Sequence, residues 1–392
     1  MKAWLLFLVL WAACAADAAV NWEPLPSLPF CRVEACAVEL TGKVYLIGGL
    51  VGRHNATSSV LVYNYGAQEW SEFVDLPTPL HHASAVTYND LIVVVGGFVS
   101  KDVWSPRVIA LNTSHSQPRW EDLARMRTPR AAAAVIRVED DIFVIGGMDE
   151  DTYGRAVESL NIRSLSWKTH APLPAGRNHM CAGRENSTLF VYGGKWAKGV
   201  SFDTVFSYDI ATGGYGNTTT LPWALNSHSC VILTPVPRQP SVNIIFGGKN
   251  DSDVSDSSWV HHAGVNLWEV AGAMAGPRHG MASAGSEGTV FAIGGSPILS
   301  DAYSCVFEAL HLTDTYNRLY GGTSRVPSPT PSPDDAGMSQ KHSGNRARVV
   351  GAVMAVGVGI VALVLVGLCV RRMRQRSRFE AIGNDTQELT SV

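Results

Sequence analysis

The stretch Lys43-Val44-Tyr45-Leu46-Ile47-Gly48-Gly49 is one of six varied copies along the 392-residue chain. In each copy an apolar run rich in β-branched residues ends in a pair of glycines. The other five pairs begin at Gly96, Gly146, Gly193, Gly247 and Gly294. Successive pairs are therefore 48, 50, 47, 54 and 47 residues apart. A near-constant period of this size is typical of repeat architectures.

Each repeat reads as four short strands. The first passes through small residues, the second ends in the glycine pair, the third alternates in polarity, and the fourth opens on an aromatic residue. Trp70 and Trp167 open the fourth strand in two repeats, and Tyr215 does so in another. One such unit cannot bury both of its faces, whereas units stacked in a ring cover one another. The pattern predicts an all-β fold.

The glycine pair, a following tyrosine and a tryptophan 7 residues later, as in Tyr63 and Trp70, resemble the kelch repeat. The resemblance covers residues from about 21 to 312 and implies a six-bladed β-propeller. Leu160 and His261 replace the tyrosine in the third and fifth repeats. The sixth repeat lacks a fourth strand, and residues 21–26 (Asn-Trp-Glu-Pro-Leu-Pro) have the sequence of one. We expect this N-terminal strand to complete the last blade and close the ring.

Two apolar segments flank the repeats. Residues 1–18 combine a positive start, an apolar core and a final Ala-x-Ala-type site, as in a secretory signal peptide. Residues 349–370 carry no charge and are long enough to span a bilayer as a helix. Five arginines between 371 and 378 follow, so the positive-inside rule places the tail in the cytosol. We expect a single-pass type I protein of the plasma membrane, with the endomembrane system as the alternative.

The chain is therefore expected to contain five parts. These are a signal peptide (1–18), a six-bladed propeller that forms the ectodomain (19–312), a Pro/Ser-rich stalk (313–348), a transmembrane helix (349–370) and a basic tail (371–392). Small residues on one face of that helix would permit a homodimer: Gly351, Ala355, Gly359 and Gly367. The net charge of −3 gives no reason to expect nucleic acid as a partner.

Five Asn-x-Ser/Thr sequons in the ectodomain are candidates for N-glycosylation: Asn55, Asn112, Asn186, Asn217 and Asn250. Asn55 and Asn250 follow glycine pairs, and we expect them on the face formed by the loops after those pairs. The other three are expected in turns on the opposite face. A bulky partner on the first face would then favour repeats two to four.

Five cysteines lie in the ectodomain: Cys31, Cys36, Cys181, Cys230 and Cys305. Cys36, Cys181 and Cys230 occupy the same small-residue place in their repeats, and we expect buried free thiols there. No cysteine has zinc- or copper-ligand spacing within one loop, so neither a metal nor a cofactor is expected. Cys31 follows the N-terminal strand and Cys305 lies on the strand it should pair with, so a disulfide between them would lock the ring closure.

Basic residues recur where the first strands begin: Arg32, His82, Arg130, Arg177, His179, His228, Arg278 and His279. The loops after the glycine pairs should share that face. Ligand-binding candidates are Arg130, Arg155, Arg177, His179, Trp104, Trp196 and Lys198. Guanidinium and aromatic groups suit carboxylate-bearing or sugar ligands. Alternatively, the arginines bond to carbonyls around the channel and the tryptophans take no part, and the sequence leaves both open.

The tail offers two further candidates. Cys369 lies beside the arginines that follow the transmembrane segment and is a palmitoylation candidate. The chain ends in Thr390-Ser391-Val392, which resembles a PDZ ligand that adds a strand to a sheet edge.

We expect a non-enzymatic cell-surface receptor or adhesion protein that binds an extracellular protein or glycan. The kelch resemblance also allows a carbohydrate-active enzyme of the sialic acid mutarotase type, which needs little beyond a proton donor-acceptor pair. A copper-radical sugar oxidase would need a Tyr/His copper set that the sequence does not assemble. An intracellular ubiquitin-ligase adaptor is opposed by the signal peptide and by the lack of a BTB-type domain. A glycan array with a sialic acid exchange assay would discriminate best.

Overall fold

The structure is a computed structural model that describes residues 22–312, apart from 53, 101–102, 151–153, 197–198, 234–240, 287 and 300–301. These residues belong to one compact unit of the chain, residues 1–325. The predicted signal peptide, stalk, transmembrane helix and tail lie outside the described residues, as do Lys198, Cys369 and Thr390-Ser391-Val392. Within the described residues no helix is long and apolar enough to cross a membrane.

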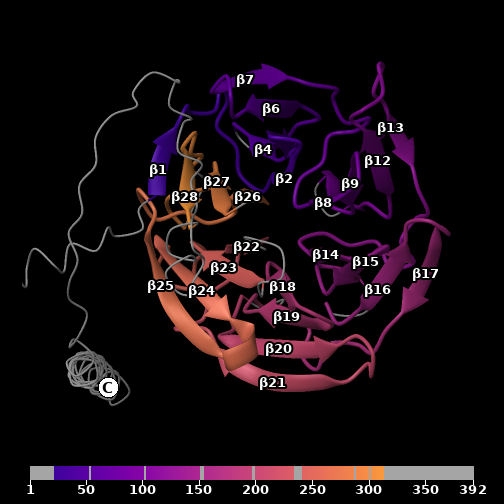
Figure 1. Cartoon of the computed structure of the whole chain (residues 1–392), viewed down its shortest axis with the longest axis vertical. Coiled ribbons are helices and arrows are strands. Elements are labelled where there is room, and N and C mark those ends of the chain that lie inside the picture. The colour runs from indigo at the N-terminus through magenta and orange to yellow at the C-terminus, as the bar shows by residue number, and fades with distance from the viewer. Residues whose placement is uncertain are drawn as a thin grey trace, which may run out of the picture. The chain divides into compact units, whose positions relative to one another are not determined.

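Six four-stranded antiparallel sheets follow one another around a central channel (Figure 1). In the order from channel to rim, the first three blades are β2 (Cys36–Leu40), β3 (Lys43–Ile47), β6 (Val60–Asn64) and β7 (Glu69–Glu72); β8 (Ser84–Tyr88), β9 (Leu91–Val95), β12 (Val108–Asn112) and β13 (Trp120–Asp122); and β14 (Ala134–Val138), β15 (Asp141–Ile145), β16 (Val157–Asn161) and β17 (Ser166–Thr169).

The last three blades are β18 (Cys181–Glu185), β19 (Thr188–Tyr192), β20 (Thr204–Asp209) and β21 (Tyr215–Thr220); β22 (Ser229–Leu233), β23 (Val242–Phe246), β24 (Ser257–His262) and β25 (Leu267–Ala273), with a 3-10 turn η1 (Ala263–Val265); and β26 (Ala282–Ser286), β27 (Thr289–Ile293), β28 (Phe307–His311) and β1 (Trp22–Leu25). Two hairpins extend loops after glycine pairs: β4 (Leu50–Val51) with β5 (Asn55–Ala56), and β10 (Phe98–Ser100) with β11 (Val103–Trp104).

The N-terminal strand completes the sixth blade. β1 pairs antiparallel with β28, with Trp22 opposite Leu310 and Leu25 opposite Phe307. The predicted closure of the ring is thus confirmed, and the six-bladed all-β architecture with it. Because the first and last strands belong to one sheet, the propeller keeps no open seam between its ends.

The glycine pairs let the chain turn where backbones meet. Gly48 and Gly49 have φ angles of 59° and 99°, a region that side chains other than hydrogen strongly disfavour. A Cβ atom on Gly48 would lie 2.5 Å from the carbonyl oxygen of Leu80 in the next blade. The pair therefore allows each second strand to contact the neighbouring blade at the channel end.

An aromatic side chain on each outer strand links its blade to the one before it. The hydrogen bonds run from Trp70 Nε1 to Pro26 O (2.9 Å), Trp120 Nε1 to Val74 O (3.1 Å), Trp167 Nε1 to Ala124 O (3.1 Å), Tyr215 Oη to Ala171 O (2.9 Å), Trp268 Nε1 to Thr219 Oγ1 (3.2 Å) and Trp22 Nε1 to Ser258 Oγ (3.1 Å). The set includes Trp22, so the closing strand makes the same type of link as the other five outer strands.

Two disulfides are present among the described residues. Cys31 is bonded to Cys305, which fastens the segment after β1 to the segment before β28. Cys181 is bonded to Cys230, so the expectation of free thiols at these two positions was wrong. Cys181 is the first residue of β18 and Cys230 the second residue of β22, two neighbouring strands at the channel wall. The expected shared position was also wrong, because the counterpart of Cys181 in β22 is Ser229. Cys36 is free and buried, and burial raises the pKa of its thiol to about 12.

The two disulfides should differ in their effect on stability. They close chain segments of 274 and 49 residues, and in the chain-entropy model the longer loop gives the larger stabilisation, by about 1.5 kcal/mol. We expect the double variant Cys31→Ala/Cys305→Ala to lose more unfolding free energy in urea than Cys181→Ala/Cys230→Ala. An equal or smaller loss would show that β1 closes the ring without help from the disulfide.

Candidate functional site

Six residues, one from each blade, form a ring around one mouth of the channel: Glu34, His82, Ala132, His179, Ser227 and Gly280. All six have left-handed backbones, with φ between 50° and 61°. The backbone N–H of each donates to the carbonyl oxygen of its counterpart in the preceding blade, and N···O distances are 2.8 to 3.0 Å. The six bonds form a closed circle, which we call the inner ring.

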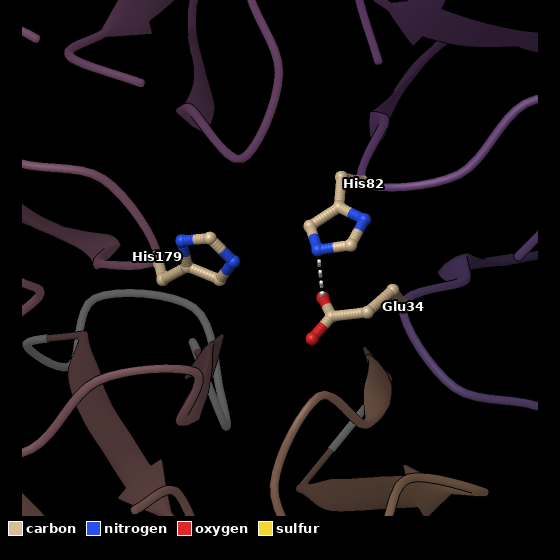
Figure 2. A group of neighbouring side chains, drawn as sticks. All are labelled: Glu34, His82 and His179. Atoms are coloured by element: carbon tan, nitrogen blue, oxygen red, sulfur yellow. Dashed lines mark ion pairs between the residues drawn. The ribbon is translucent and has the colours of Figure 1, made fainter. Parts of the chain in front are cut away.

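The inner ring brings three reactive side chains together. Glu34, His82 and His179 point toward one another across the mouth (Figure 2). Glu34 Oε2 lies 3.5 Å from His82 Nε2, and the two imidazole centroids are 5.2 Å apart. Below them runs a cavity of about 220 Å³ with a wall of small residues such as Ala37, Ser84 and Ala85. Functional groups therefore concentrate at the mouth.

Two lysines lie beside this cluster. Lys195 and Lys249 follow the glycine pairs of blades four and five directly, and backbone bridges to Asn178 and Asn226 hold them near the inner ring. Neither Lys249 nor Glu34 was among the predicted ligand-binding residues. Position relative to the repeat could have found them, since Glu34 aligns with His82 and His179, and Lys249 aligns with Lys195.

Burial keeps the histidines of the mouth neutral. It lowers the pKa of His179 far below the usual range, and the charges of Lys195 and Lys249 add to this effect. Burial also lowers the pKa of His82, against the opposing effect of the Glu34 carboxylate. The pKa of Lys249 is lowered by burial first and then by the charge of Lys195. Glu34 is the one carboxylate among the described residues that line the channel.

The buried arginines serve the scaffold. Arg177 Nη1 donates to the carbonyl oxygens of Gly193 (2.9 Å) and Thr204 (3.2 Å). Arg32 and Arg278 make the equivalent bonds in their blades. Arg130 instead pairs with Glu158 at 2.5 Å and is 1% exposed. Arg130 and Arg177 are thus wrongly predicted as ligand-binding residues, because Glu158 takes up the guanidinium of Arg130 and a glycine-pair carbonyl takes up that of Arg177. The alternative interpretation, with arginines bonded to carbonyls around the channel, holds for Arg32, Arg177 and Arg278.

The other predicted loop residues differ in exposure. Trp196 is 39% exposed, and Arg155 is exposed while its Nε donates to Leu173 O at 2.8 Å. Trp104 is half-buried, with its ring centroid 6.0 Å from that of Phe98. Lys198 lies outside the described residues. Trp196 and Arg155 therefore stay candidates for ligand contacts at the surface. His179, at the mouth, stays a candidate as well.

The sequons divide between the two faces. Asn55 lies on β5 and Asn250 is the second residue after Gly248, both on the glycine-pair side. Asn112 ends β12 opposite Leu91, and Asn186 lies in the turn between β18 and β19, both at the other side. Asn217 was expected in a turn but lies within the outer strand β21, opposite Phe206. Glycosylation of these asparagines stays a prediction.

A family model, the KLHDC2/KLHL20/DRC7 Kelch-repeats domain, matches residues 34–233. The chain belongs to the Kelch-repeat family. It is 28% identical over 178 residues to Kelch-like protein 41b of Danio rerio, covering 44% of this chain and 29% of that protein. It is 24% identical over 303 residues to Kelch-like protein terF of Aspergillus terreus, covering 70% of this chain and 64% of that protein.

These kelch relatives extend well beyond the matched part, because the chain covers less than two thirds of either protein's length. Among solved structures, that of YjhT superposes with a TM-score of 0.60 at 15% identity, covering 72% of this chain and 96% of that one. At this identity the likeness shows the shared propeller fold alone.

Arg177 and Arg155 should respond differently to truncation. Arg177→Ala leaves the buried carbonyl of Gly193 without a donor and removes one of the two donors to Thr204 O, and we expect it to lower the unfolding free energy by about 2 kcal/mol or more. Arg155→Ala, at an exposed position, should change it by about 0.5 kcal/mol or less. Urea unfolding of the full-length variants measures both. Similar losses would mean that the guanidinium of Arg177 contributes no more than a surface group.

Proposed function

We propose that this protein is a non-catalytic receptor or adhesion protein of the cell surface that binds a carboxylate-bearing extracellular protein or glycan at the inner-ring face. The observation that carries the proposal is the pair Lys195 and Lys249, which stand together at the mouth, where Glu34 is the one carboxylate among the described residues that line the channel. Two cations against one anion leave the mouth with a surplus of positive charge, which attracts an anionic group.

The surroundings of the lysines suit a ligand that carries both a carboxylate and a sugar ring or apolar group. Trp196 follows Lys195 directly and is 39% exposed, so an aromatic face adjoins the cation. Such a face packs against a sugar ring or an apolar side chain, while the ammonium groups bind the carboxylate. Arg155 extends the cationic edge from the neighbouring blade. The scaffold arginines are buried, which leaves these loop residues as the groups able to contact a ligand.

A cell-surface location is supported by the disulfides and by the flanking sequences. Two disulfides in one domain are typical of proteins that fold in an oxidising compartment. Residues 1–18 and 349–370 have the composition of a signal peptide and a membrane span. In this proposal the tail recruits a PDZ-type partner through Thr390-Ser391-Val392, Cys369 carries a palmitoyl group, and the membrane helix permits a homodimer.

The proposal is tested by binding of the full-length chain to an array of sialylated glycans, neutral glycans and peptides with free carboxylates. We expect binding to carboxylate-bearing probes and a loss of affinity of about 10-fold or more in Lys195→Gln/Lys249→Gln, because charge-assisted bonds are removed. Trp196→Ala should weaken binding as well.

Lys168→Gln is the matched control, since Lys168 is exposed on the outer strand β17 and its loss should leave binding unchanged. Failure to bind any carboxylate-bearing probe, or equal binding by the double lysine variant, contradicts the proposal. A sialic acid anomer-exchange assay on the same sample should show no acceleration, and catalysed exchange would point to the mutarotase alternative.

A further inference from the structure

Three side chains of metal-ligating type meet at the channel mouth. Glu34, His82 and His179 each offer one ligand atom, and these atoms all lie within 4.8 Å of one another. We propose that they form a metal site for Zn²⁺ with two imidazole nitrogens and one carboxylate oxygen as protein ligands. The inference goes beyond the proposed function, because it requires neither the extracellular ligand nor a membrane location.

The backbone holds the three ligands in place before any metal arrives. Each stands at a left-handed position of the inner ring, where its N–H and C=O are both engaged by neighbouring blades. Three blades contribute one ligand each, so the spacing of the ligands is set by the closed propeller and not by a flexible loop. A site built on such fixed elements loses little conformational entropy when the metal binds.

Neighbouring polar groups orient both imidazoles. His179 Nδ1 lies 2.7 Å from Asn178 Oδ1, and because a carboxamide oxygen only accepts, Nδ1 carries the proton. The Nε2 of neutral His179 then keeps its lone pair, and Figure 2 shows this nitrogen directed into the mouth. His82 Nδ1 lies 2.7 Å from His81 Nδ1, which leaves His82 Nε2 toward Glu34. Metal-bound histidines are typically held in this way through their other nitrogen.

The donor set fits Zn²⁺. Two histidines and one carboxylate with a fourth position open are a common arrangement for this ion. With metal–ligand distances of about 2.0 to 2.2 Å, tetrahedral ligand atoms stand about 3.4 Å apart. Glu34 Oε2 and His82 Nε2, at 3.5 Å, already match that separation. A side-chain rotation that moves the ligand nitrogen of His179 by about 1 to 1.5 Å would complete the site, since no separation within the cluster exceeds 4.8 Å.

Substitution of the lysines distinguishes a metal site from a simple ion pair between Glu34 and the lysines. Lys195 and Lys249 interact electrostatically with Glu34, so the carboxylate could act as their counter-ion without binding a metal. In a metal site their positive charge opposes the cation, and removing it strengthens Zn²⁺ binding. If Glu34 were only the counter-ion of the lysines, the cluster would bind no Zn²⁺ in the original chain or in the double lysine variant.

The test is titration of the metal-free, full-length chain with Zn²⁺ by calorimetry. We expect one Zn²⁺ bound per mouth, lost in His82→Ala and in His179→Ala and tightened in Lys195→Gln/Lys249→Gln. Asn178→Ala should weaken binding by about 10- to 100-fold, because the orientation of His179 depends on Asn178. Ser227→Ala changes an inner-ring residue outside the three-ligand cluster and should bind as the original chain does.

Folding of the variants is checked separately. Alanine is native to the inner ring at Ala132, so the alanine variants should fold, and their unfolding midpoints in EDTA should stay close to that of the original chain. Added Zn²⁺ should raise the midpoint of the original chain and of Ser227→Ala but not of His179→Ala. Co²⁺ loading should give a visible absorption band that is absent in His179→Ala. Absence of Zn²⁺ binding, or binding unaffected by both histidine variants, overturns the proposal.

Discussion

The closed circle of six backbone hydrogen bonds at the inner ring is the constraint on which the rest of the structure depends. Five of its six residues are not glycine, and a left-handed backbone costs such a residue about 1 to 2 kcal/mol. A hydrogen bond contributes a similar amount, about 1 kcal/mol, so the conformation persists only because every blade engages both neighbours. The pairing of β1 with β28 keeps the propeller closed, and the Cys31–Cys305 disulfide does so too. Both therefore stabilise the six hydrogen bonds of the inner ring.

The same backbone hydrogen bonds explain why some residues hold the blades together while others are available for binding. Ala132 and Gly280 fulfil the backbone role of the inner ring as well as Glu34 or His179 does. Side chains at these positions are therefore not required for the ring itself, and polar ones are available for binding. The buried arginines and the outer-strand aromatics, in contrast, are engaged in holding blades together. Functional groups thus gather at the mouth and in the loops that follow the glycine pairs.

The blades, their number and the closing strand could be predicted from the sequence because they repeat. A strand pattern that is weak in one repeat becomes reliable when it recurs in six. The pairing of Cys181 with Cys230 could not, since the two cysteines differ by one place in their strands and the sequence does not show how closely adjacent first strands approach. Repeat position places Glu34 level with His82 and His179, but it does not show that the three side chains meet. Only the left-handed backbone directs these side chains inward, and no residue type in the sequence signals that conformation.

The inner ring should open only when the whole propeller unfolds. Native-state hydrogen exchange of the full-length chain measures this directly. The amides of Glu34, His82, Ala132, His179, Ser227 and Gly280 should exchange with one common free energy, equal to that of global unfolding. The amide of Gly199, which lies in an exposed turn and donates to Trp196 O, should exchange far faster. Ring amides that exchange independently of one another, at loop-like rates, would contradict the account.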